Sequence, residues 1–410
     1  MGNIFKDNHK KLQVHDSDNE SSKIMDFEEM NLWLDGLKGT KIKEVEPIGF
    51  TTFHYPIRHF VYGHGKNHVI LTAGTHAAEL ITNHFLIHFM NTILNQNDLI
   101  DETDYTLHLI PILNPEGTII VTSAIRTVIP RKTTPFWEEL FCMQYYMNSK
   151  LEDQYVIDKN DHDNKLQMWM FRYADVNCIS KIHDALKKNV EQIIKEQHLP
   201  EGVLSQWSSN GMGIDLNANV KYTRYYKETI EKIKVPHILR LNQISNTFPG
   251  PIGCPFQNQE FAYEKENEAL LHFYHKLINE EQVIGSLIYH SCGNYVYYLD
   301  KEEMENPYRK EYGEKEFQYN HEVAKVDAKV TGYRLLKDKK YTTMDALLKT
   351  MLPGTLLIEL GNIRSNPLSQ FIDTIDNVYT NIMEKNTEAI PIVLEEMRKQ
   401  YGKNYQKENV

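Results

Sequence analysis

The chain is poor in cysteine, with 4 among 410 residues, and no two of them form a Cys-x-x-Cys pair. This scarcity excludes a cysteine zinc cluster and argues against a disulfide framework. No run of 18 apolar residues occurs, so we expect no transmembrane helix. Cationic side chains are the minority, and the net charge of −11 excludes nucleic acid as an expected partner. With no apolar signal segment either, we expect a cytoplasmic protein without a membrane or nucleic-acid partner.

What is present is a regular alternation of strands and helices. Apolar segments typical of buried strands are followed by longer segments with a helical period, which predicts a layered α/β fold. We expect one large domain over residues 26–400, between a polar tail at 1–25 and a charged tail at 401–410. A segment at about 136–204 with helical periodicity and few turn signals is expected to be a helical insertion. We also expect a hairpin turn at 63–67 between two of the strands.

The segment Val69–Glu79 carries the first chemical signal. An apolar strand breaks at Gly74 and is followed by His76 and Glu79, which we expect at the start of a helix. A spacing of three residues places two helical side chains on one face. A histidine and a carboxylate that face the same point are two of the three protein ligands that a catalytic zinc ion needs. Taken alone, the pair could equally be a helix start with a structural histidine.

Two further polar residues stand at the ends of buried strands. His290 follows the apolar run Ile284–Tyr289, and Glu359 lies within Thr355–Leu360. In open α/β sheets, ligands and reactive groups collect at the carboxyl ends of the strands. A carboxylate within so apolar a strand is costly to bury without a function. We therefore predict that both residues meet the pair formed earlier in the chain.

Five short motifs occur in one order along the chain, and together they resemble the zinc carboxypeptidases of the carboxypeptidase A type. The resemblance extends over roughly Gly49 to Ile382. It implies a three-layer α/β/α fold with a mixed, mostly parallel central sheet. The motifs are Gly74-Thr-His-Ala-Ala-Glu79, Asn114-Pro-Glu-Gly117, Gly213-Ile-Asp-Leu-Asn217, Tyr289-His-Ser-Cys-Gly293 and Leu357-Ile-Glu-Leu-Gly361.

The resemblance also implies a cofactor and a reaction. One Zn²⁺ ion would be held by His76, Glu79 and His290, leaving a position open for water. The metal would lower the pKa of that water and polarise a substrate carbonyl. Glu359 would act as general base and then as general acid toward the leaving amine. Asp215 would accept a hydrogen bond from the ring nitrogen of His76 that does not bind the metal, and so orient the imidazole.

Substrate-binding residues follow from the resemblance as well. Asn217 matches a family residue that binds substrate near its terminal carboxylate. Tyr333 and Tyr341 both match the mobile tyrosine that covers the scissile bond, with Tyr333 preferred. The context of Tyr333 is similar to that in bacterial members of the family that act on γ-D-glutamyl-diaminopimelate peptides. A peptide or peptide-like molecule is thus the expected substrate, while no pattern indicates an oligomeric state.

The chain departs from the family at the arginines that hold the substrate carboxylate and the oxyanion. Ala78, Ser208 and Ala218 stand where those arginines are expected. A bidentate arginine clamp cannot be replaced by serine or alanine, so the sequence does not predict release of a standard C-terminal residue. The positive charge that the missing arginines would supply could come from another arginine of the chain. The three candidates are Arg364, Arg126 and Arg131.

The sequence is also compatible with two alternatives to a peptidase. The same ligand pattern occurs in amidohydrolases that remove an acyl group from an amino acid. A non-catalytic zinc-binding or peptide-binding protein could retain the fold, and the lost arginines favour it. The retained Glu359 speaks against this second alternative, because a binding protein needs no general base.

Overall fold

The computed structural model describes residues 24–38, 40–95, 99–128, 176–197, 204, 207–220, 262–299, 313–338, 343–361 and 378–405. The expected tail at 1–25 therefore lies almost entirely outside the described residues, as does most of the expected insertion at 136–204. Within the insertion, a helix is present at α7 (Asp184–Gln197). None of the described helices is long and apolar enough to cross a membrane.

A mixed sheet of 8 strands forms the centre of the molecule, in the order β1-β2-β4-β3-β5-β8-β6-β7. The central pairs β4·β3, β3·β5 and β5·β8 and the edge pair β6·β7 are parallel, whereas β1·β2, β2·β4 and β6·β8 are antiparallel. The sheet thus confirms the predicted mixed, mostly parallel architecture. The strands are β1 (Ile42–Phe50), β2 (Pro56–Gly63), β3 (Asn67–Thr72), β4 (Tyr105–Ile110), β5 (Val283–His290), β6 (Tyr295–Leu299), β7 (Arg334–Asp338) and β8 (Thr355–Glu359).

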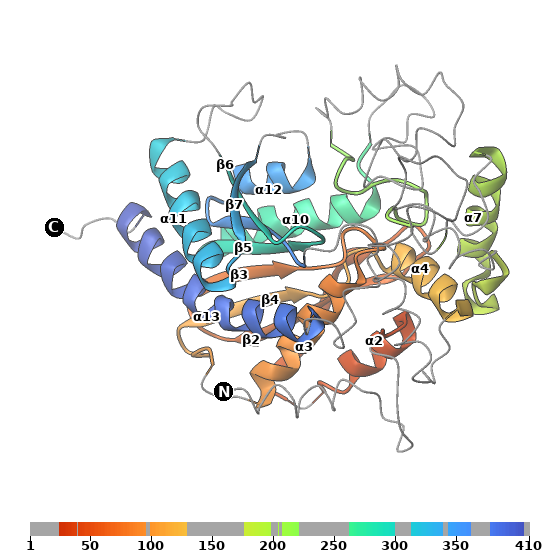
Figure 1. Ribbon diagram of the computed structural model, residues 1–410, viewed down its shortest axis with the longest axis horizontal. Helices are drawn as coiled ribbons and strands as arrows, with labels where there is room; N and C mark the ends of the chain where they lie inside the picture. The colour runs from red at the N-terminus through yellow and green to blue at the C-terminus, as the bar shows by residue number, and fades with distance from the viewer. Residues whose placement is uncertain are drawn as a thin grey trace, which may run out of the picture.

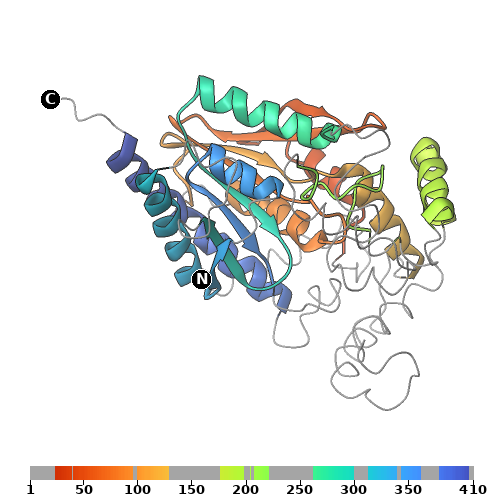
Figure 2. The ribbon, with the colours of Figure 1, turned by 90° about the horizontal axis from the view of Figure 1, so that it is seen from above.

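Helices cover both faces of this sheet, as the two perpendicular views show (Figure 1, Figure 2). Side chains of a strand alternate between faces, and those of β3 divide accordingly between two cores. Val69 and Leu71 pack in the larger core with α3 and α13, whereas Ile70 packs in the smaller core with α10 and α12. The helices are α2 (Phe27–Asp35), α3 (Leu80–Asn95), α4 (Pro115–Val128), α7, α10 (Lys265–Glu280), α11 (Glu314–Thr331), α12 (Met344–Met351) and α13 (Val378–Tyr405), with short 3₁₀ turns at Val176–Cys178 and Lys181–His183.

The segment between β2 and β3 is not a hairpin turn, and this expectation is wrong. The two strands it joins do not pair, because β4 lies between them. The loop instead wraps around the start of β4: the amide of Gly65 donates to the carbonyl of Tyr105 at 3.3 Å, and the Thr106 hydroxyl donates to the carbonyl of Gly65 at 2.6 Å. The residues typical of a hairpin turn therefore form a loop between β2 and β3, both of which pair with β4.

The C-terminal helix is longer than the sequence suggested. The sequence predicts a charged tail from residue 401, but α13 (Val378–Tyr405) continues to Tyr405. Aromatic contacts explain the extension, since the rings of Tyr401 and Tyr405 lie 5.1 Å apart and Tyr405 also contacts Tyr319 of α11 at 6.2 Å. Packing against a neighbouring helix therefore outweighs the charged composition of these last turns.

Candidate metal centre

A turn after β3 carries the first two candidate ligands. Gly74 leaves the strand with φ +73°, which glycine adopts at little cost, and a Cβ there would lie 2.2 Å from the Asn83 side chain. The amide of Glu79 then donates to the carbonyl of His76 at 3.2 Å, and α3 begins only at Leu80. The expected position of both ligands in the first helical turn is therefore wrong. The compact turn brings their side chains together instead.

Backbone contacts with two distant segments hold this turn in place. The amide of Ala77 donates to the carbonyl of Ser208 at 3.2 Å. The side-chain amide of Asn114 donates to the carbonyls of Thr75 and Ser209 at 3.2 and 3.0 Å. Asn114 is also the residue before α4, and its side-chain oxygen accepts from the Gly117 amide at 2.9 Å. The Asn-Pro-Glu-Gly motif thus serves as a helix start that supports the turn.

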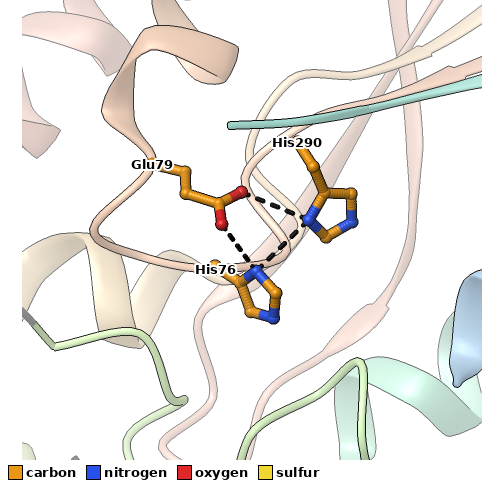
Figure 3. A group of neighbouring side chains, drawn as sticks. All are labelled: His76, Glu79 and His290. Atoms are coloured by element: carbon orange, nitrogen blue, oxygen red, sulfur yellow. Dashed lines mark hydrogen bonds and ion pairs between the residues drawn. The ribbon is translucent and has the colours of Figure 1, made fainter. Parts of the chain in front are cut away.

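Three side chains converge on one point, as Figure 3 shows. The Nδ1 of His76 lies 2.8 Å from one carboxylate oxygen of Glu79, and the Nδ1 of His290 lies 3.2 Å from the other. The two Nδ1 atoms are 3.2 Å apart, and both histidines are buried. The structure therefore brings together the three residues predicted as metal ligands, from the turn after β3 and the end of β5.

Each of the two imidazoles has an aspartate behind it. The Nε2 of His76 lies 3.1 Å from Oδ1 of Asp215, and the Nε2 of His290 lies 3.2 Å from Oδ2 of Asp345. Both aspartates are buried, and the Asp345 atom has no aligned hydrogen-bond partner among the described residues. An imidazole that keeps its proton on Nε2, toward a carboxylate, presents the lone pair of Nδ1 to the centre.

The electrostatics of this cluster favour a cation. Burial lowers the pKa of His290, but the negative charges of Asp345 and Glu79 outweigh this effect and raise it to about 10. The same balance between burial and the charges of Glu79 and Asp215 raises the pKa of His76 well above its usual range. Burial raises the pKa of Glu79, yet the two histidines lower it to about 2. Three carboxylates, of which Asp215 and Asp345 are buried and Glu79 is half-buried, therefore form with the two imidazoles a site that attracts positive charge.

Glu359 stands beside the cluster at the end of β8. It is the register partner of His290 on the neighbouring strand, and its side chain remains partly exposed. Loss of solvation and the charge of Glu79 raise the pKa of Glu359 to about 8. A carboxyl group with a pKa near neutrality can both accept and release a proton at the working pH. Its exposure leaves it accessible to a molecule bound over the cluster.

The donor set fits a zinc ion. Two imidazole nitrogens and one carboxylate are a usual ligand set of a catalytic zinc, and ligand atoms ~2.0–2.1 Å from one ion stand roughly 3.3 Å apart in a tetrahedron. The atom separations of 2.8, 3.2 and 3.2 Å among His76, Glu79 and His290 are close to that spacing. The buried aspartates behind both imidazoles supply the outer contacts that metal-bound histidines need.

The two described substrate-binding candidates have structural contacts. The side-chain oxygen of Asn217 accepts from the amide of Asp345 at 3.2 Å, so it tethers the start of α12 to the loop of Asp215. Tyr333 is 7% exposed, and its hydroxyl accepts a hydrogen bond from Asn386 of α13 at 2.9 Å. Neither contact tests a role toward substrate, which stays a prediction for both residues. Tyr341 lies outside the described residues.

The positions that lack the family's arginines are filled by small, largely enclosed residues. Ala78 and Ala218 are 7% and 6% exposed. Of the cations proposed to compensate, Arg126 is used in another part of the molecule. Its Nε lies 3.1 Å from Asp26, and its guanidinium also pairs with Glu29 at the start of α2. Arg131 and Arg364 lie outside the described residues.

Asp345 is the member of the cluster that the sequence did not indicate. It lies in the first turn of α12, where acidic residues are common at any helix start. A weak signal was available, because Thr343 precedes it as an N-cap residue and fixes where the helix begins. Without the position of α12 over β5, however, nothing in the sequence distinguishes this aspartate from an ordinary helix-terminal residue.

Replacing either aspartate is expected to weaken zinc binding. We expect Asp345→Asn and Asp215→Asn each to lower zinc affinity by about 10- to 100-fold, because an amide holds the imidazole without the negative charge. Competition with a chromogenic chelator measures the affinity directly. Asp184→Asn, at the exposed start of α7, serves as the matched control. Unchanged affinity in both site variants would show that the aspartates do not support the metal.

Comparison with known proteins agrees with this geometry. The sequence matches the family model for zinc carboxypeptidases over residues 36–349. Bovine thrombin-activatable fibrinolysis inhibitor, solved with a tick carboxypeptidase inhibitor, has a TM-score of 0.51 at 11% identity, over 92% of this chain and 98% of that chain. Carboxypeptidase A from Helicoverpa armigera has a TM-score of 0.51 at 11% identity, over 99% and 81% of the two chains. A search of curated proteins found no match.

At these identities the solved structures show a shared fold, and the family model shows the relationship. The matched range spans most of the chain and includes His76, Glu79, Asp215 and His290, while Glu359 lies just beyond it. The chain belongs to the zinc carboxypeptidase family, a family of zinc metallopeptidases.

Proposed function

We propose that the protein binds one Zn²⁺ ion through His76, Glu79 and His290 and hydrolyses a peptide or amide bond with Glu359 as general base and acid. The observation that carries this proposal is the convergence of two Nδ1 atoms on the Glu79 carboxylate, within 3.2 Å of one another, beside Glu359. When bound there, zinc supplies a Lewis acid that polarises the scissile carbonyl and acidifies a water molecule.

The side chains of this chain perform the remaining steps. Asp215 and Asp345 hold the two imidazoles with Nδ1 toward the centre, so the ligand geometry exists before substrate arrives. Glu359 accepts a proton from the attacking water, and the same carboxyl group then returns the proton to the leaving amine. Its raised pKa, about 8, suits this double role, because the group gains and loses a proton near neutral pH.

A panel of four substrates tests the reaction class. It consists of a peptide with a free C-terminus, the same peptide as its C-terminal amide, an N-acyl amino acid and a γ-D-glutamyl peptide. We expect the zinc-loaded protein to cut at least one of the three peptides, with products identified by mass spectrometry. Cleavage of the N-acyl amino acid alone would assign the protein as a deacylase. No cleavage of any substrate by zinc-loaded protein would instead favour the non-catalytic alternative.

A further inference from the structure

Four side chains form a row across the sheet at the level of the candidate site. His290 is paired in register with Glu359, Glu359 with Tyr295, and Tyr295 with Arg334, across β5, β8, β6 and β7. Residues that are register partners on neighbouring strands project from the same face of a sheet. The row therefore continues from the metal ligand and the general base to an arginine on the same face.

Contacts further along the same strands identify this face. Asp338 lies four residues after Arg334 on β7, so the two side chains project from the same face. The carboxylate of Asp338 lies 2.5 Å from the ammonium group of Lys349 on α12. The same ammonium group lies 5.9 Å from the ring centre of Tyr297, two residues from Tyr295. The alternate residues of β6 and β7 thus face α12, the helix that also carries Asp345 behind His290. Lys349 itself is fully buried and cannot reach a substrate.

Arg334 is an exposed residue, and its guanidinium group stacks on the neighbouring strand that separates it from Glu359. It lies 4.6 Å from the ring centre of Tyr295 and donates to the hydroxyl of that residue. Since Tyr295 is on the strand between Arg334 and Glu359, this stacking displaces the charge toward Glu359. Within the described residues, no carboxylate lies within 4.0 Å of the Arg334 guanidinium. A guanidinium has five N–H donors, so most of them remain available.

The separation suits a group close to the scissile bond. Neighbouring strands stand ~4.8 Å apart, so the backbones of Glu359 and Arg334 are roughly 10 Å apart. An extended peptide advances about 3.3–3.6 Å per residue. If the leaving side of the substrate extends along this row, a carboxylate on the first residue after the scissile bond lies between Glu359 and the guanidinium of Arg334. A cation is absent at Ala78, Ser208 and Ala218, so a substrate carboxylate needs a positive charge from another part of the chain.

We propose that Arg334, stacked on Tyr295, binds a carboxylate on the leaving side of the substrate and so determines specificity. This inference rests on the proposed function, because it takes the scissile bond to lie at Glu359. The ligand class is a carboxylate, and it has two possible sources: the terminal carboxylate of a C-terminal residue, or an acidic side chain on the first residue after the scissile bond. An arginine suits this role because its planar guanidinium can donate two parallel hydrogen bonds to the two oxygens of one carboxylate.

Three peptides distinguish the sources: one ending in alanine as the free acid, the same peptide as its amide, and an amide with glutamate in place of that alanine. Arg334→Met should lower kcat/KM by roughly 10- to 100-fold on whichever carboxylate-bearing peptide the wild type prefers, the loss expected for a charged hydrogen bond. The neutral amide should change by less than about threefold on the same reasoning. Arg334→Lys, which keeps the charge without the bidentate geometry, should recover part of the loss.

Lys337→Met is the matched control, because it removes the same charge from the other face of β7. We expect it to leave all three activities unchanged. Equal losses on acid and amide peptides with Arg334→Met, or no loss on the carboxylate-bearing peptides, would overturn the proposal.

A binding measurement separates this proposal from the proposed reaction. In the zinc-loaded Glu359→Gln protein, calorimetry should show tighter binding of the preferred carboxylate-bearing peptide than of the neutral amide. Adding Arg334→Met should abolish that difference. This result supports the role of Arg334 even if the wild type cuts none of the peptides, which would count against the reaction alone. Equal binding of all three peptides to Glu359→Gln protein would refute the role of Arg334, whatever the turnover.

Discussion

Glu359→Gln is expected to retain zinc and lose turnover. Glutamine has nearly the same shape as glutamate but cannot accept a proton from water, and general-base catalysis contributes about 10²- to 10⁴-fold to such reactions. We therefore expect kcat to fall by that factor, with KM and zinc content nearly unchanged. The zinc content should stay because Glu359 belongs to β8 and is not one of the three converging ligands.

Steady-state kinetics on the best peptide of the panel, with zinc measured by mass spectrometry, checks this prediction. Glu268→Gln is a suitable control, since Glu268 is an exposed carboxylate on α10 whose partner is Lys265 at 2.7 Å. Activity of Glu359→Gln within about threefold of the wild type would show that another group accepts the proton, because loss of a general base lowers kcat by much more than this.

His290→Ala should remove the metal. The substitution deletes one of three converging ligands, and a catalytic zinc held by only two protein ligands is not retained against competition. We expect the zinc content to fall from about one ion per chain to a small fraction after dialysis against a weak chelator, with no detectable turnover.

Stability must be measured beside the zinc content, because the alanine leaves the buried carboxylate of Asp345 and the half-buried carboxylate of Glu79 without the imidazole that lies between them. Loss of one member of a buried ion pair costs about 3–5 kcal/mol. His290→Gln, which keeps a polar side chain, separates loss of the ligand from loss of the fold. His272→Ala, at an exposed position on α10, is the histidine control. Near-stoichiometric zinc in a folded His290→Ala protein would exclude His290 as a ligand.

The ligands could be predicted from sequence because each follows a strand that is apolar and short. Val69–Ala73 leads to His76 and Glu79, and Ile284–Tyr289 leads to His290. The ends of these strands can therefore be identified from the sequence alone. The parallel pairing of β3 with β5 and of β5 with β8 then brings these ends to one edge of the sheet. Local patterns and the general geometry of parallel sheets together were sufficient here.

Contacts between distant segments could not be predicted in the same way. The order of the strands depends on long-range pairing, and β4 enters between β2 and β3 although it follows both in the chain. Asp345 reaches His290 only because α12 packs over β5, and Arg334 joins the row only through the register of β6 and β7. Neither the crossover nor the register is encoded in a short window of sequence.

The account depends most directly on where a metal ion binds. We suggest crystals of zinc-loaded protein measured on both sides of the zinc absorption edge, which locates the ion without reference to activity. The account predicts one anomalous peak per chain, between Nδ1 of His76, Nδ1 of His290 and the carboxylate of Glu79. The absence of a peak there, or a peak only at another group such as the hydrogen-bonded histidines His59, His68 and His108, would contradict it.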